Sequence, residues 1–449
     1  MTYRKKLIEV ALPLDAINKE SIREKAIRHG HPSTLHLWWS RKPLATCRAV
    51  LFASLVDDPS NDLPEEEAKV ERDRLFSLLE DLVKWENSND DKVLGLVRAE
   101  IRKSTGGTLP PVLDPFCGGG SIPLEAQRLG LEAHGSDLNP VAVLITKALI
   151  EIPPKFAGLP PVNPEARGKI GSEGNWRGAK ALAEDVRYYG RWMRDEAEKR
   201  IGHLYPKGPN GETVIAWLWA RTVRCPNPAC GASMPLVSSF WLSKKKKNRK
   251  VWVEPIVDRE AREVRFEVRT GDGMPQDPPK MGRGAKFRCL VCSQAVEEGY
   301  LKAEGQAGRM GQQSMAVVGE GHRGRVYFSP EECRLPTPQE LSAKWKPETQ
   351  LSTHPQYMAA PRYGMRTNAD LFTPRQLVSL TTLVDLVAEA WQQAKDDASA
   401  AGLGNDDRNL SESGSGAIAY ADAVKVYLSL SISRLANRAS TLCFWDTDG

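Results

Sequence analysis

The sequence predicts an α/β fold in which the ends of neighbouring strands form a nucleoside-binding crevice, with a cysteine-rich module inserted later in the chain. Two stretches predict it. An apolar run at residues 112–114 leads into three glycines and an amphipathic segment that ends at Gly130, and a second short run is followed by Asp137. Two close cysteine pairs then fall within residues 205–330. A length of 449 residues suggests two or three domains.

The composition is typical of a globular protein in water, with 41% hydrophobic and 27% charged residues. No apolar run approaches the roughly 18 residues of a membrane span. The basic start of the chain is not followed by the apolar core of a signal peptide, so we expect a cytoplasmic protein without a membrane partner. A net charge of +5 permits nucleic-acid binding through a local patch but does not require it.

Glycines 118–120 form the turn between the predicted strand and helix. Glycine adopts backbone conformations closed to other residues and lets a ligand approach the main chain. We expect Ser121 to cap the following helix and Gly130 to end it. The next helix is expected over residues 141–151, beginning at Asn139-Pro140.

Two carboxylates follow the two predicted strands, Asp114 on the first and Asp137 about 20 residues later on the second. A tight turn without a ligand would explain the glycines but not the two acids. The Gly-x-Gly-x-x-Gly pattern of dinucleotide enzymes is missing. The pattern therefore favours a nucleoside ligand other than a dinucleotide.

The segments Asp114-Pro-Phe-Cys-Gly-Gly-Gly-Ser121 and Ser136-Asp-Leu-Asn-Pro140 resemble the S-adenosylmethionine-binding motif of amino-methylating DNA methyltransferases. The usual form is Asp-Pro-Phe-x-Gly-Ser-Gly-Thr, from which Gly119 and Ser121 depart. The resemblance implies that Asp114 and the glycine backbone hold the methionine part of the donor, and that Asp137 holds the ribose hydroxyls. The cofactor-binding residues expected from it are Asp114, Pro115, Phe116, Gly118, Gly119, Gly120, Asp137 and Asn139.

The block Ser21–Pro43 contains three histidines, two adjacent tryptophans and a basic pair. The tryptophans could be core residues and the histidines satisfied polar groups at a turn. The block also resembles the amino-terminal domain of the DUF1156 family of prokaryotic adenine-specific DNA methylases, which carry a zinc ribbon. In related methylases a segment before the donor motif often closes over the donor, so we expect Arg41, Lys42 and Pro43 to line the pocket. His29, His31, Trp38 and Trp39 receive no individual role.

Helical periodicity and capping residues predict further helices. The segment 44–56 is apolar nearly all round and is expected to be buried. The other predicted helices are an amphipathic one around 75–85, one over 178–201, one over 374–394 with Thr373 as its cap, and one over 420–439.

The four grouped cysteines are Cys225, Cys230, Cys289 and Cys292. In a reducing cytoplasm close cysteine pairs indicate a metal rather than disulfides. Two such knuckles supply the four soft ligands of a closed tetrahedral zinc site, which would be structural because no position is left for water. The 58 residues between the knuckles would be an insertion, and two unrelated pairs of free thiols are the alternative.

A basic run lies inside this insertion, between Phe240-Trp241 and Val251-Trp252. Such a run is usually a solvated face, but the flanking aromatics favour a turn that contacts the phosphates of double-stranded DNA. The expected nucleic-acid-binding residues are Lys244, Lys245, Lys246, Lys247, Arg249 and Lys250.

The domain organisation implied by the resemblance is a Rossmann-like S-adenosylmethionine-dependent methyltransferase sheet of the α/β class with an inserted zinc-ribbon module. We expect an amino-terminal DUF1156-like helical region at 1–105 and a donor-binding part at 106–204. A zinc-ribbon insert that recognises DNA follows at 205–330. Residues 331–449 return to the methyltransferase domain, which is incomplete at its carboxyl end.

The implied function is methylation of the exocyclic amine of adenine in DNA, in restriction-modification or phage defence. Amino-methylases use Asp/Asn-Pro-Pro-aromatic at a strand end. The similar Asp277-Pro-Pro-Lys280 lacks the aromatic residue and follows no strand, so no catalytic residue is assigned. Family members carry this motif beyond the point where these 449 residues end. We therefore expect a fragment that binds donor and DNA but is catalytically weak or inactive.

The sequence is also compatible with two other functions. One is a non-catalytic DNA-binding subunit of a defence complex with other subunits. The other is an RNA amino-methyltransferase.

Overall fold

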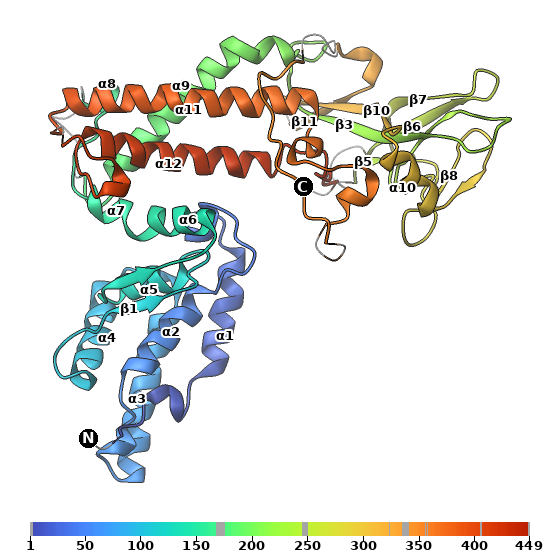
Figure 1. Ribbon diagram of the computed structural model, residues 1–449. Coiled ribbons are helices and arrows are strands. Elements are labelled where there is room, and N and C mark those ends of the chain that lie inside the picture. Colours follow the sequence, from blue (N-terminus) through green and yellow to red (C-terminus); the bar gives the residue numbers. More distant parts are fainter. Residues whose placement is uncertain are drawn as a thin grey trace. The chain divides into compact units, whose positions relative to one another are not determined.

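The computed structural model describes residues 3–167, 176–244, 250–322, 324–334, 341–354, 356, 358–404 and 406–447 (Figure 1). The chain divides into two compact units. Unit 1 comprises Met1–Met193 and Leu386–Leu435, and unit 2 comprises Arg194–Asp385 and Ala436–Gly449. The predicted division of roles among four segments stays a prediction.

The amino-terminal part of unit 1 is helical and is organised around one apolar helix. Its elements are η1 (Leu7–Glu9), α1 (Leu14–Arg23), η2 (Glu24–Ala26), η3 (Pro32–Thr34), α2 (Leu44–Leu55), η4 (Pro59–Asn61), α3 (Glu65–Val83), η5 (Trp85–Asn87) and α4 (Asp91–Ser104). As predicted, α2 is buried, and its Ala49 and Phe52 are fully covered. They share a core with Leu79 and Leu82 of α3 and with Leu129, just after the glycine-loop helix. The helical region and the loop region thus fold as one hydrophobic unit.

The glycine segment forms the predicted strand, turn and helix. Its elements are β1 (Val112–Asp114), α5 (Ser121–Arg128), β2 (Ala133–Gly135) and α6 (Pro140–Ile150). Strands β1 and β2 pair in parallel, with Asp114 opposite Gly135. Gly130 ends α5 with a left-handed φ of 83°, as predicted. The predicted cap was wrong: Gly120 precedes the helix, and Ser121 is its first residue with a buried hydroxyl that has no hydrogen-bond partner.

The predicted Rossmann-like sheet is not shown. In the described part of the chain, β1 and β2 make a two-stranded sheet and the other sheets are antiparallel, so the class is mixed α/β. The sequence pattern marked two strand ends correctly but did not specify further strands for this sheet. Leu113, Phe116 and Leu138 are 68%, 86% and 100% exposed, an arrangement that differs from the covered faces usual for parallel sheets.

The remainder of unit 1 is formed by helices from both parts of the chain. Its elements are α7 (Ile152–Lys155), α8 (Pro164–Arg167), part of α9 (Lys180–Ile201), part of α11 (Pro374–Ala400), η11 (Leu410–Glu412) and α12 (Ala417–Ala436). The carboxylate of Asp185 on α9 is buried and accepts hydrogen bonds from the backbone of 162–163 and from the Tyr420 hydroxyl of α12. Residues 386–435 therefore return to unit 1, as helices rather than strands.

The predicted helices over 178–201 and 420–439 are confirmed to within three residues at each end, whereas the one predicted around 75–85 is the second half of α3, which begins at Glu65. The cap of α11 is also confirmed, because Thr373 Oγ1 accepts from the N–H of Gln376 at 3.2 Å. Helix α11 continues to Ala400, past the predicted end at 394. None of the helices in the described ranges combines the length and apolar character that a membrane span requires, and a cytoplasmic location stays a prediction.

Unit 2 is mainly antiparallel. Its elements are η6 (Gly202–Leu204), β3 (Thr213–Arg224), β4 (Ser233–Pro235), β5 (Trp241–Ser243), β6 (Lys250–Asp258), β7 (Glu263–Gly271), β8 (Phe287–Arg288), β9 (Ala295–Val296), α10 (Glu298–Gln306), β10 (Gly311–Gly321), β11 (Gly324–Phe328), η7 (Pro330–Glu332), η9 (Ala360–Tyr363) and η10 (Asn368–Leu371). One sheet has the order β11-β10-β3-β4, another β5-β6-β7, and β8 pairs with β9. The insertion between the cysteine pairs contributes β5, β6 and β7, which pack through Phe240 and Phe266 onto Ala316 of β10.

Candidate functional site

The glycine loop is fastened to the end of β2 by hydrogen bonds. The N–H of Gly118 donates to Asp137 Oδ2, and the N–H of Asn139 donates to Asp137 Oδ1, each at 2.9 Å. These two donors hold the pKa of Asp137 below its ordinary value. Gly118 and Gly120 have φ of 50° and 73°, the left-handed region that favours glycine. Asp137 therefore fixes the loop and keeps a charged carboxylate beside it.

A cavity of about 290 Å³ opens between the glycine loop and the amino-terminal block. It is lined by Trp38, Ser40, Lys42, Asp114, Phe116, Cys117, Gly118, Gly119, Ser121, Ile122 and Asp137. The structure brings Asp114, Phe116, Gly118, Gly119 and Asp137 together at this cavity, out of the eight predicted cofactor-binding residues.

The other three predicted residues support the loop instead of lining the cavity. The carbonyl of Pro115 accepts from Ser136 Oγ at 3.2 Å. A Cβ at Gly120 would lie 3.0 Å from Thr146 Oγ1, so glycine here allows α5 to pack on α6. Asn139 caps α6 by accepting from the N–H of Val141 at 2.9 Å.

Trp38 and Arg41 of the amino-terminal block lie directly on the glycine loop. A Cβ at Gly118 would be 2.7 Å from Trp38 Nε1, and one at Gly119 would be 2.9 Å from Arg41 Cζ. Arg41 Nη1 also donates to the Gly119 carbonyl at 2.6 Å. The block therefore covers the loop closely: a side chain at Gly118 would meet the Trp38 ring, and one at Gly119 would require the flexible end of Arg41 to move.

The residues of the block that contact the loop were predicted only in part. Among the three residues expected to line the pocket, Lys42 does so, Arg41 grips the loop, and Pro43 instead precedes α2 as its N-cap residue. Trp38 and Ser40 also line the cavity and were missed as ligand contacts. The available signal was their position immediately before the basic pair.

A buried ionic cluster joins α2 to α5, the helix after the glycine loop. Arg48 of α2 and Glu125 of α5 are both fully buried, with Nε and Oε2 3.1 Å apart. Arg48 Nη1 also donates to the Leu82 carbonyl at 2.9 Å, and Arg128 pairs with Glu125 Oε1 at 2.5 Å. Burial raises the pKa of Glu125 and lowers that of Arg48. Removing one partner of such a buried pair typically costs about 3–5 kcal/mol.

Glu24 and His31 extend this cluster into the amino-terminal block. Glu24 caps α2 by accepting from the N–H groups of Leu44 and Ala45 at 2.8 and 2.9 Å. His31 lies 4.0 Å from Glu24, and its Nδ1 accepts from the N–H of Ser33 at 3.2 Å. Burial, with the nearby arginines, lowers the pKa of His31 to about 4, so its imidazole is neutral at pH 7. This histidine therefore has a structural environment rather than that of a general base.

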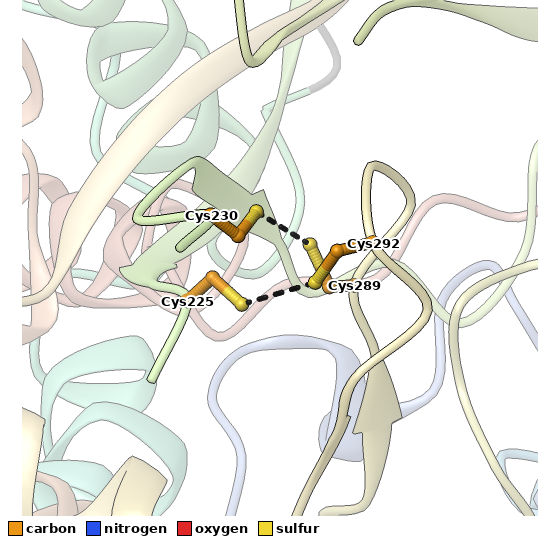
Figure 2. A group of neighbouring side chains, drawn as sticks. All are labelled: Cys225, Cys230, Cys289 and Cys292. Carbon is orange, nitrogen blue, oxygen red and sulfur yellow. Dashed lines mark hydrogen bonds between the residues drawn. The ribbon is translucent and has the colours of Figure 1, made fainter. Parts of the chain in front are cut away.

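The four predicted cysteines meet in unit 2 (Figure 2). Sγ atoms of Cys225 and Cys292 are 3.6 Å apart and those of Cys230 and Cys289 are 3.9 Å apart. All four lie within 4.8 Å of one another. A tetrahedron with metal–sulfur bonds of 2.3 Å has sulfur–sulfur edges of about 3.8 Å. The cluster could therefore hold a metal such as zinc.

The two knuckles share one geometry. The N–H of Cys225 donates to the Ala232 carbonyl at 2.8 Å, and that of Cys289 donates to the Gln294 carbonyl at 2.9 Å. The residue after the second cysteine has a left-handed φ in both, 59° at Gly231 and 64° at Ser293. Burial raises the pKa of the Cys225 and Cys289 thiols, whereas at Cys292 burial is outweighed by hydrogen bonds from the Gln294 backbone and the neighbouring thiols, which lower its pKa to about 7, and a divalent cation would favour the thiolate forms.

The basic run is only partly described. Lys245, Lys246, Lys247 and Arg249 lie outside the described residues. The ammonium groups of Lys244 and Lys250 are each 5.9 Å from the centre of the Trp241 ring, within cation–π distance. Asp277 lies exposed in the coil between β7 and β8.

Comparison with known families gives one match, at the amino-terminal end. Residues 11–78 match DUF1156, which is described as a protein of unknown function. This supports the predicted DUF1156 family over the segment that contains Trp38, Arg41 and Arg48. Neither the curated proteins nor the solved structures gave a match.

Zinc is expected at one ion per chain. Replacing Cys225 and Cys289 with serine should abolish it, because two ligands cannot retain a structural site. Elemental analysis of the purified chain measures this, and the matched control is Cys333→Ser with Cys443→Ser, which leaves the cluster intact. Hydrogen exchange after chelation should rise around 205–330 and not in the glycine-loop region, because metal binding stabilises the module it closes. A zinc content near zero, or one unchanged in the Cys225/Cys289 variant, contradicts the assignment.

Proposed function

We propose that the chain is the donor-binding and DNA-binding part of an S-adenosylmethionine-dependent DNA methyltransferase, acting on the exocyclic amine of adenine in restriction-modification or phage defence. The observation that carries the proposal is the cavity at the carboxyl ends of β1 and β2. There the glycine loop, Asp114 and Asp137 adjoin one space. Its volume of about 290 Å³ is close to the lower end for small-molecule sites.

The groups around the cavity match the chemistry of the donor. Asp114 and Asp137 can accept from an ammonium group and from ribose hydroxyls, and attract the positive charge of a sulfonium. Each oxygen of Asp137 accepts one backbone N–H, which leaves lone pairs for a ligand. Lys42 offers a cation to a carboxylate, and the exposed ring of Phe116 offers a flat apolar face to a purine. Bound there, the donor supplies an electrophilic methyl group.

The acceptor half of the reaction needs groups that the described residues around the cavity do not supply. The exocyclic amine is a poor nucleophile, because its lone pair is conjugated with the ring. Related enzymes flip the base out of the duplex and place acceptors on the amine hydrogens. No Pro-Pro-aromatic strand end adjoins the cavity among the described residues. We propose that further polypeptide supplies these acceptors, packing on the exposed Leu113 and Leu138 beside the parallel pair.

We propose that unit 2 binds DNA. A closed four-cysteine site would brace β3, β4, β8 and β9, and the β5–β6 hairpin presents lysines beside tryptophan. Lysine contacts to phosphates position a protein on DNA without reading sequence. A non-catalytic subunit that keeps the donor pocket is a second candidate, favoured by the exposed, loop-borne position of Asp277.

Donor binding is expected with micromolar affinity, about −8 kcal/mol. Asp137→Ala should weaken binding by roughly 1.5–3 kcal/mol, since it removes a charged acceptor and frees Gly118. Calorimetry with S-adenosylmethionine measures both values, and Glu132→Ala, an exposed acid just before β2, is the matched control. Failure of the wild-type chain to bind the donor or its demethylated product at millimolar concentration would end the methyltransferase proposal.

Methyl transfer by these 449 residues alone is expected to be undetectable, because the amine acceptors are missing from the described site. The measurement is transfer of a radiolabelled methyl group to mixed-sequence DNA. The control adds any polypeptide that copurifies with the chain in its native host. Turnover by the chain alone that disappears in Asp277→Ala would mean that Asp277 is the catalytic residue after all.

DNA binding is expected to depend on salt and on the β5–β6 hairpin. Each lost phosphate contact lowers the slope of log affinity against log salt by about 0.9, so Lys244→Ala with Lys250→Ala should lower it by about 1.8. Fluorescence anisotropy on duplex DNA at several salt concentrations gives the slope. The exposed pair Lys92→Ala with Lys103→Ala in unit 1 should leave it unchanged, and an equal loss in both pairs argues against a hairpin site.

A further inference from the structure

Unit 2 contains a second cavity, of about 350 Å³, which neither the donor pocket nor the cysteine cluster uses. It lies between β3, α10 and the segment that leads from η9 into α11. Its lining includes charged, aromatic and sulfur-containing side chains: Arg221, Lys346, Tyr363, Met365, Asp370 and Phe372. Cations, aromatic rings and a thioether therefore adjoin one space of small-molecule size.

One wall of this cavity is held rigidly by two glycines in backbone contact. A Cβ at Gly364 would be 2.0 Å from the Gly305 carbonyl oxygen, and one at Gly305 would be 2.4 Å from the Tyr363 carbonyl oxygen. Gly364 also has a left-handed φ of 86°. The Tyr363 hydroxyl donates to Glu298 Oε1 at 3.2 Å, which fixes the ring against α10. This wall of the cavity is therefore closely packed.

Arg221 brings a positive charge to the cavity without an anionic partner. Its Nη2 donates to Thr441 Oγ1 at 3.2 Å and lies 3.9 Å from Met365 Sδ, and both are neutral acceptors. Within the described ranges no carboxylate forms an ion pair with it, and burial lowers its pKa. A half-buried guanidinium is stabilised when an anion takes its remaining donors, and its planar fork suits phosphate.

The other charged groups at the cavity leave a net positive site. Lys346 is exposed and makes no ion pair within the described part of the chain. Asp370 is already engaged, because its Oδ2 accepts from the N–H groups of Arg366 and Thr367 at 2.7 and 2.8 Å. Two cations therefore face one carboxylate that is committed to the turn at η10.

We propose that this cavity binds a nucleotide, with its phosphate on Arg221 and Lys346 and its base against Phe372 and Tyr363. The shared chemistry is a phosphate linked through a sugar to a flat base, which a free mononucleotide and a nucleotide of a single DNA strand both present. The site lies within unit 2 and does not depend on donor binding in unit 1.

The test is calorimetry of the 449-residue chain with deoxyadenosine monophosphate, in saturating S-adenosylhomocysteine to exclude the donor pocket. Arg221→Gln should weaken binding about tenfold or more, the scale of a lost charge-assisted hydrogen bond, and Lys346→Ala should weaken it several-fold. Lys344→Ala, an exposed lysine that does not line the cavity, should change it less than twofold. Deoxyadenosine, which lacks the phosphate, should bind at least tenfold more weakly than the nucleotide.

A second arm with a short single-stranded oligonucleotide distinguishes the two sources. Tighter binding of the oligonucleotide, lost in the same variants, identifies a strand, and equal or weaker binding identifies a free nucleotide. The site is refuted if neither ligand binds at millimolar concentration, or if Lys344→Ala matches Lys346→Ala. Lys346→Ala alone decides the matter if Arg221→Gln does not fold. The affinity of Lys346→Ala for S-adenosylmethionine, measured without S-adenosylhomocysteine, should equal that of the wild-type chain. Loss of nucleotide binding with unchanged donor binding therefore separates this site from the donor pocket.

Discussion

The buried pair of Arg48 and Glu125 is the interaction on which the candidate donor site depends. Neither side chain reaches solvent, and the effective desolvation cost of such ions is several kcal/mol each. That cost is offset only while both partners and their hydrogen bonds stay in place. Because Arg48 lies on α2 and Glu125 on α5, a displacement of one helix relative to the other would separate two buried charges. This pair, which does not line the cavity, therefore helps to hold α5, whose Ser121 and Ile122 do line it.

Local chemistry made much of the structure predictable from the sequence. The glycines, the acid after each strand and Gly130 specify a strand, turn and helix through backbone conformations that few other residues adopt. The Thr373–Gln376 cap set the start of α11 for the same local reason. Cysteine spacing likewise predicted four thiols in one place, although 58 residues separate the knuckles. For the loop and the cap, the signal and the structure lie within a few residues of each other, whereas each cysteine knuckle is local but the two knuckles meet across 58 residues.

The errors and omissions have a different physical origin. Ser121 satisfies the residue preference for a cap, but the left-handed Gly120 occupies the cap position and leaves the serine inside the helix. The contact of Trp38 with Gly118 joins residues 80 positions apart in the chain, and the spacing of apolar residues in the sequence does not indicate such a contact. A full parallel sheet was inferred from two strand ends. The pairing partners of a parallel strand are distant in sequence, so local patterns cannot show whether further strands follow.

The glycine at position 119 and the amino-terminal block are structurally linked, because Arg41 of the block packs on this glycine. Where the related motif has serine, this chain has Gly119, and a Cβ there would be 2.9 Å from Arg41 Cζ. Arg41 in turn donates to the carbonyl of the same glycine at 2.6 Å. The guanidinium of Arg41 thus occupies the space into which a side chain at position 119 would project, and it brings positive charge to the loop. The loop is therefore held from two sides, by Asp137 at the end of β2 and by Arg41 of the block.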